Sequence, residues 1–182
     1  MRQLFLMTTA ALAACASRER RAPRPPTDSA FAEVKERGAS VMGVDQYTSA
    51  HVFEDLPDGG RIVLDRGDPA DSAGIATIRA HMRQITADFT AGDFSKPFAV
   101  HATVVPGTKT MAQRRDRITY EATDRPGGAE VRIRTADAKA IAAVHEFLAF
   151  QRSDHRAAGH EGMDHSAHMG APTPPTPEAS PK

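Results

Sequence analysis

The residue types best suited to chemistry gather near the C-terminus, where residues 159 to 169 hold three imidazoles, two thioethers and two carboxylates. Imidazole nitrogen suits Cu(II), Zn(II) and Ni(II), whereas thioether sulfur is a soft ligand for Cu(I). The expected ligands are His160, Met163, Asp164, His165, His168 and Met169, with Glu161 as a weaker oxygen donor. The segment therefore predicts binding of copper as Cu(I) or Cu(II), with zinc or nickel as further candidates. A flexible peptide can wrap an ion without a fold, at the cost of ordering entropy.

The competing interpretation of this segment is a solvated low-complexity tail in which histidine has no function. A tract of histidine alone would leave the two interpretations equally weighted. Methionine is apolar and has no evident role in an otherwise polar tail, so its recurrence beside histidine favours copper.

A second group of histidines lies in the part of the chain that is expected to fold. Its members are His51, His81, His101, His145 and His155. A histidine at the edge of a buried face most often hydrogen-bonds to the backbone, and no HxxxH or HExxH pair marks a helix here. These residues are therefore a speculative second metal site, because the sequence does not show whether they converge in space.

The N-terminus has the pattern of a bacterial lipoprotein signal. Arg2 precedes an apolar stretch from residue 4 to 14, which ends in Leu-Ala-Ala before Cys15, the only cysteine. Such a run is too short to span a hydrocarbon core, which takes roughly 20 residues. Lipid attachment gives a lone cysteine without a disulfide partner a role. We expect a signal peptide over residues 1 to 14, cleavage before Cys15, and acyl chains on Cys15 that hold the protein on a membrane.

The expected location is the bacterial cell envelope, with the protein anchored by lipid and facing the periplasm. Ala16 rather than aspartate follows the cysteine, which resembles the sorting pattern for the outer membrane. The chain has 23 basic and 23 acidic residues, so loss of Arg2 with the signal changes the net charge from 0 to −1. A near-neutral chain gives no electrostatic reason to expect nucleic acid as a partner.

Composition divides the mature chain into three parts. Residues 15 to 27 are expected to form the anchor and an Arg- and Pro-rich tether, and residues 156 to 182 a disordered tail. Residues 28 to 155 are expected to fold as one domain. Within this domain, residues 29 to 37 are a candidate short helix and residues 98 to 105 a candidate additional strand.

The same order of signals occurs twice in this domain. Residues 52 to 56 and 61 to 65 flank a Pro-Asp-Gly-Gly turn and predict a β-hairpin, since Asp-Gly readily takes the positive φ of tight turns. A helix follows, with Asp68 as the expected N-cap and Gly92 as the stop. Its apolar stripe consists of Ile75, Ile78, Met82, Ile85 and Phe89.

The second unit repeats this order. Residues 118 to 122 and 130 to 134 flank a Pro-Gly-Gly turn and predict another hairpin, and Thr135 is expected to cap the helix that follows. The apolar residues of this helix are Ile141, Val144, Phe147 and Leu148. Neither ββα unit can bury its helix alone, so the expected fold is α+β, with one antiparallel sheet and both helices on one of its faces.

Two resemblances add to these predictions. The run Met-Asp-His-Ser-Ala-His-Met at residues 163 to 169 is similar to segments of bacterial periplasmic copper-resistance proteins. Met-Gly-Val-Asp-Gln at residues 42 to 46, the Leu-Pro-Asp-Gly-Gly turn, and Val-His-Glu-Phe-Leu-Ala-Phe-Gln at residues 144 to 151 resemble a family of uncharacterised bacterial exported proteins. The first resemblance implies that the segment binds a metal. The second family has no assigned activity, so this resemblance does not indicate what the domain does.

The leading functional hypothesis is capture or buffering of copper, or a related ion, by the tail of a lipid-anchored periplasmic protein. The alternative is a non-enzymatic envelope module that binds a protein partner through its sheet face or an edge strand. A third hypothesis is a metal-dependent enzyme that uses the domain histidines, although the chain has no G-x-S-x-G elbow or P-loop and no residue is predicted to be catalytic. Convergence of His51, His81 and His145 in space would favour a domain metal site or an enzyme.

Overall fold

The computed structural model describes residues 27 to 43 and 48 to 157. The signal peptide, Cys15, all but the last residue of the tether, and the expected tail ligands lie outside the described residues. Among the helices in the described ranges, none has the length and apolar character needed to cross a membrane.

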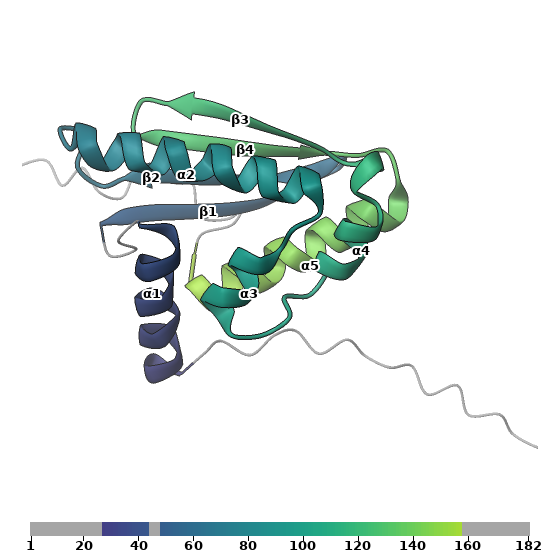
Figure 1. The fold of residues 1–182 in the computed structure, drawn as a ribbon, viewed down its shortest axis with the longest axis horizontal. Helices are drawn as coiled ribbons and strands as arrows, with labels where there is room; N and C mark the ends of the chain where they lie inside the picture. The colour runs from purple at the N-terminus through teal and green to yellow at the C-terminus, as the bar shows by residue number, and fades with distance from the viewer. Residues whose placement is uncertain (1–26, 44–47, 158–182) are drawn as a thin grey trace, which may run out of the picture.

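The part of the chain that the structure describes contains a four-stranded antiparallel sheet with the strand order β1-β2-β4-β3 (Figure 1). The strands are β1 (Ser49–Leu56), β2 (Gly59–Arg66), β3 (Thr119–Arg125) and β4 (Gly128–Arg134). β1 and β2 form the first expected hairpin, and β3 and β4 form the second. The two hairpins join through β2 and β4, where Ile62 pairs with Val131. The predicted α+β fold with one antiparallel sheet is therefore confirmed.

Two long helices follow the hairpins, as expected: α2 (Ser72–Ala91) and α5 (Ala138–His155). α2 packs on β4 and β3, while α5 packs on β1 and β2. Both helices share one core with the sheet, in which Phe89 of α2 meets Phe147 of α5 with ring centroids 5.7 Å apart. The two helices therefore cover the same face of the sheet.

Three shorter helices complete the described fold: α1 (Asp28–Met42), α3 (Ser95–His101) and α4 (Thr108–Gln113), with a 3-10 turn at Arg115–Arg117. The helix expected over residues 29 to 37 is confirmed as the N-terminal part of α1, which continues to Met42. This helix packs against α3 and α5 near the β1 edge of the sheet (Figure 1). Arg37 donates a hydrogen bond from Nε to the carbonyl oxygen of Val100 in α3 at 2.7 Å, which ties the two helices together.

The first long helix begins three residues later than its N-cap signal predicts. Asp71 holds the N-cap position, where its carboxylate accepts a hydrogen bond from the N–H of Gly74 at 2.9 Å. Asp68, the expected cap, instead accepts from the N–H of Ala70 in the preceding turn. Two aspartates of equal capping preference stand close together, so residue type does not discriminate between them. The helix ends at Gly92 with φ +79°, as expected.

The second long helix also begins later than expected. Asp137 is the N-cap and accepts hydrogen bonds from the N–H groups of Lys139 and Ala140 at 3.0 and 3.1 Å. The Thr135 hydroxyl, expected in this role, accepts from the N–H of Asp137 at 3.1 Å. A carboxylate at this position also interacts favourably with the positive end of the helix dipole.

The prediction of a strand at residues 98 to 105 is wrong, because residues 95 to 101 form the helix α3. Pro97, Val100 and His101 are its buried residues, at the i, i+3, i+4 spacing of a helix face. A short apolar run does not by itself separate a buried strand from a buried helix. Because this segment is a helix, His101 at its end is buried against the core.

Tyr120 of β3 has a buried hydroxyl that finds no hydrogen-bond partner among the described residues. Its ring packs edge-on against Phe89, and burial raises the pKa of the hydroxyl well above its usual range. Replacing Tyr120 with phenylalanine is expected to leave the free energy of unfolding unchanged or to raise it by about 1 kcal/mol, since an unsatisfied buried polar group is costly. Urea denaturation of both proteins measures the difference. A loss of stability in the variant would show that the hydroxyl is satisfied after all.

Candidate functional site

A cavity of about 70 Å³ lies between the sheet and helices α2, α3 and α5. Apolar side chains of β1, β2 and all three helices form most of its wall. The polar residues that line it are His51, His81, Lys96, His101, Gln151 and His155. On this measure one water needs roughly 10 to 15 Å³, so the cavity has room for a few waters or one small ligand.

Four of the five histidines predicted from the folded part line this one cavity. His51 comes from β1, His81 from α2, His101 from the end of α3 and His155 from the end of α5. At least 19 residues lie between each histidine and the next of the four along the chain, so only the fold brings them together. These four histidines therefore line one cavity. The expected convergence of His51, His81 and His145 is not found, because His145 does not line it.

His145 is the exception among the five. Its Nε2 lies 3.0 Å from the carbonyl oxygen of Leu56 and 2.9 Å from that of Gly59, and donates to them. The imidazole thus ties α5 to the turn of the first hairpin. This is the backbone hydrogen-bonding role that a histidine at the edge of a buried face most often has.

His155 stands at the centre of an aromatic stack in the cavity wall. Its ring centroid lies 5.3 Å from that of His51, with the two planes 10° apart, and 4.9 Å from that of His101, with the planes 82° apart. Phe53 completes the group, with its ring centroid 5.7 Å from His155. The stack holds the ring planes of His51 and His155 nearly parallel.

His101 is buried and has partners at both ring nitrogens. Nδ1 pairs with the carboxylate of Asp154, and Nε2 lies 3.0 Å from Oε1 of Gln151. Asp154 and Gln151 belong to α5, so these bonds clamp the end of α3 onto that helix. His101 therefore shapes the wall of the cavity, and its nitrogens are already engaged.

The other three imidazoles are held in their neutral form. Burial lowers the pKa of His51 and of His81 from 6.5 to about 4, and His81 and Lys35 lower that of His51 further by charge repulsion. Burial, with His51 and His101 nearby, also holds the pKa of His155 well below 6.5. A neutral imidazole carries a nitrogen lone pair, which is the form that binds a metal ion or accepts a proton.

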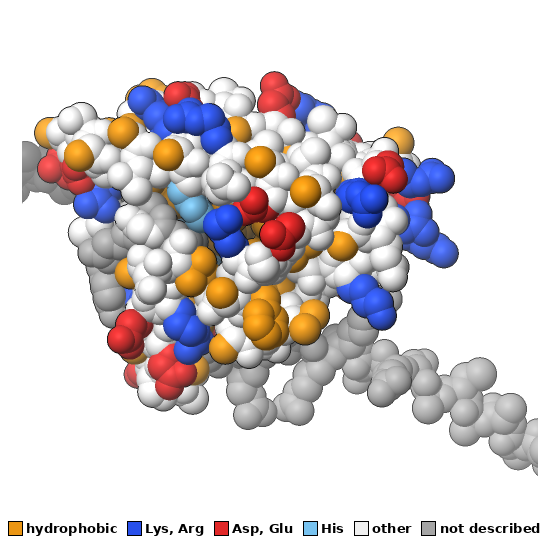
Figure 2. All heavy atoms as spheres, in the orientation of Figure 1, with side chains coloured by type: hydrophobic (Ala, Val, Ile, Leu, Met, Phe, Trp, Pro, Cys, Tyr) orange, Lys and Arg blue, Asp and Glu red, His pale blue; other side chains and the backbone are white. Residues whose placement is uncertain are grey.

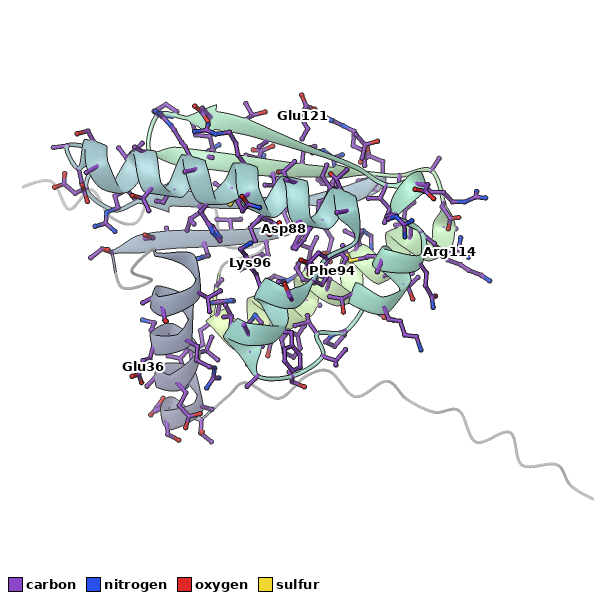
Figure 3. All side chains as sticks on the ribbon, viewed as in Figure 1. Glu36, Asp88, Phe94, Lys96, Arg114 and Glu121 are labelled. Carbon is purple, nitrogen blue, oxygen red and sulfur yellow. The ribbon has the colours of Figure 1, made fainter. Side chains whose placement is uncertain are left out.

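An ion pair joins the two helices at one side of the cavity. Lys96 of α3 lines the cavity and pairs with Asp88 of α2, and the two side chains point toward each other between these helices (Figure 3). Both charges act on His81, because Lys96 lowers its pKa and Asp88 raises it. On the face drawn in Figure 2, histidine atoms reach the surface beside a basic and an acidic side chain.

The donor atoms of the cavity include one that the sequence analysis missed. Among the described residues, no group of three or more His, Cys, Asp or Glu side chains is arranged to hold a metal ion. Met82, however, also lines the cavity and is 2% exposed, and its side chain carries a thioether sulfur. The sequence analysis placed Met82 in the apolar stripe of a helix. The signal that could have found it is its neighbour His81, because the pair has the same residue types as His168 and Met169 in the tail.

The opposite face of the sheet bears on the protein-interaction alternative. Side chains alternate between faces along a strand, so Glu54 and Arg61 point away from the helices that cover Phe53 and Ile62. Arg61 pairs with Glu54 and lies 3.6 Å from Glu130 of β4. Arg61, Glu54 and Glu130 therefore satisfy one another on this face.

The fold and the cavity together define the class of protein: a small α+β domain with a histidine-lined apolar cavity between its sheet and its helices. Comparisons with protein-family models, with curated proteins and with solved structures give no match. The function is therefore inferred from the side chains of this chain.

Proposed function

We propose that this protein is a lipid-anchored protein of the bacterial cell envelope that binds copper, or a related transition metal, on the periplasmic side. The observation that carries the proposal is the convergence of His51, His81 and His155 from three different elements on one cavity. Clusters of titratable side chains with shifted pKa values in a cavity mark functional sites more often than chance positions do. The lipid anchor at Cys15 and the ligands of the tail belong to the proposal on the strength of their sequence patterns.

The composition of the cavity favours metal binding over catalysis. Among the described residues that line it there is no carboxylate, hydroxyl or thiol. A hydrolytic site needs a nucleophile or an activated water together with a group that orients it. Metal binding needs neutral donor atoms, and the imidazoles of the cavity wall supply donors of that type.

Titration with Cu(I), Cu(II) and Zn(II) tests the proposal. The full chain is compared with a full-length variant in which the tail ligands are replaced: His160, His165 and His168 by asparagine, and Met163 and Met169 by leucine. We expect both proteins to bind copper, the variant with fewer ions per chain, because the cavity is left intact. A His145→Asn variant serves as a matched control, since it removes one imidazole outside the cavity.

Failure of both proteins to bind any of the three ions more tightly than a short histidine peptide would overturn the proposal. The protein-interaction module would then become the leading hypothesis. Binding that disappears entirely in the tail variant would keep the proposed function and place it in the tail alone.

A further inference from the structure

We infer that the cavity is a Cu(I) site of low coordination number, in which the imidazoles of His51 and His81 and the thioether of Met82 hold the ion. This inference rests on the proposed function and names the ion and the ligands of the site in the domain. His155 stacks on His51 with ring centroids 5.3 Å apart and holds that ring in place.

The types of donor atom point to this ion. Thioether sulfur is a soft ligand that binds Cu(I) well and contributes little to the binding of Zn(II) or Ni(II), whereas imidazole binds all of them. Met82 and His81 are consecutive residues of α2, His51 lies on β1, and all three line the cavity. An ion between β1 and α2 would therefore meet nitrogen from both elements and sulfur from one of them.

The number of donors points the same way. A structural zinc site takes four ligands, usually in a tetrahedron. In the described ranges no group of three or more His, Cys, Asp or Glu side chains could hold an ion, so a site in this cavity must use fewer than three imidazoles. Met82 is the lining residue that can add a sulfur donor to them. Cu(I) accepts two or three ligands and keeps no firmly bound water, which suits a small apolar cavity.

Charge is the third argument. The cost of moving an ion from water into an apolar medium grows with the square of its charge, so a dication costs about four times as much as a monocation. The carboxylates nearest to the cavity are already paired, Asp154 with His101 and Asp88 with Lys96. The donors of the site are neutral, and Lys96 on the wall adds a positive charge that Asp88 only offsets, so a monovalent ion costs less here than a divalent one.

The test uses the full-length tail variant described above, so that the domain supplies the ligands. Cu(I) is added without oxygen and in competition with a chromophoric Cu(I) chelator. Met82→Leu keeps the volume of the side chain and removes the sulfur, and His51→Gln removes one nitrogen. We expect each change to lower the affinity for Cu(I) by about tenfold or more, since it removes a direct ligand.

Matched controls exist for both replacements. Met111 is a fully buried methionine of the same core that does not line the cavity, so Met111→Leu is expected to leave the Cu(I) affinity unchanged. His145→Gln is the matched control for His51→Gln, because His145 does not line the cavity, and it is also expected to leave the Cu(I) affinity unchanged. X-ray absorption at the copper edge adds a direct readout, in which sulfur scattering is present in the parent and the Met111 variant and absent from the Met82 variant.

Equal Cu(I) affinities of the Met82 and Met111 variants would overturn the inference. So would binding of Zn(II) at least as tight as that of Cu(I). A tail variant that binds no copper, beside an intact chain that does, would also remove the cavity site while leaving the proposed function in place. If neither protein binds copper, the proposed function and this inference fail together.

Discussion

Acidification from about pH 7 to about pH 4 is expected to destabilise the metal-free domain by up to about 3 kcal/mol for each of the two imidazoles of His51 and His81. Both have a pKa of about 4 in the folded protein, compared with 6.5 for an ordinary histidine, chiefly because of burial. Between these two values the unfolded chain binds protons that the folded chain excludes. The free energy of unfolding therefore falls as the pH falls through this window, and the effect levels off below about pH 4.

The charged groups around the two rings support this direction. Lys35 faces His51, and Lys96 and Asp88 face His81. The two lysines oppose a further positive charge, and Asp88 offsets part of the repulsion at His81. Burial is the largest cause at both rings, so the window is set mainly by the apolar wall of the cavity and depends little on salt.

Urea denaturation at about pH 7, 5.5 and 4.5 measures the effect. The control is the double variant His51→Gln and His81→Gln, in which the loss of stability across this range is expected to be much smaller. Aspartates with lowered pKa values, such as Asp71 and Asp137, lose their contribution at lower pH in both proteins alike. Parallel curves for the two proteins would contradict the prediction.

Replacement of Gly107 by alanine is expected to destabilise the domain by about 3 kcal/mol or more, because a side chain at this position meets backbone. Gly107 has φ +82° between α3 and α4, and a Cβ there would lie 2.0 Å from the carbonyl oxygen of Ala143 and 3.2 Å from the backbone nitrogen of Phe147. Those atoms belong to the backbone of α5, which packs on β1 and β2 and cannot move away without losing that packing. The loop would therefore lift from α5 and carry the end of α3 with it.

Gly43 offers a matched control for this replacement. It also has a positive φ, +65°, but a Cβ there meets no described atom within 4 Å. Gly43→Ala thus carries only the cost of a left-handed conformation, about 1 kcal/mol. Thermal unfolding of both variants separates the two contributions. Similar losses in the two variants would show that close packing at Gly107 contributes nothing.

The parts of the fold that could be predicted from the sequence are those with local signals. The Asp58-Gly59 turn, the alternation along the strands and the helix stop at Gly92 each act within a few residues. The pairing of β2 with β4 has no such signal, since it joins Gly59 to Arg134 across the intervening helices. Residues 98 to 105 show a second limit of prediction from sequence. A short apolar run fits a strand and a helix equally well, and only its packing against other elements determines which of the two forms.

The candidate site divides in the same way. The residue types were predictable, since an imidazole is a possible ligand wherever it stands. The convergence of His51 and His155 was not, because a β-strand and the end of a distant helix meet only through the packing of α5 on β1. Met82 was missed for a physical reason: a buried methionine in a helical stripe serves the core, and its second role is visible only from the cavity that it faces.

The position of His155 at the end of α5 has a consequence for how the two sets of predicted ligands communicate. The chain leaves the domain at the wall of the cavity, and His160 follows five residues later. Five residues reach at most about 18 Å. Because His160 is joined to the cavity wall by so short a linker, its effective concentration at the cavity is about millimolar or above, however dilute the protein is. Exchange of an ion between tail and cavity would then be a first-order step within one molecule, with a rate that does not change on dilution.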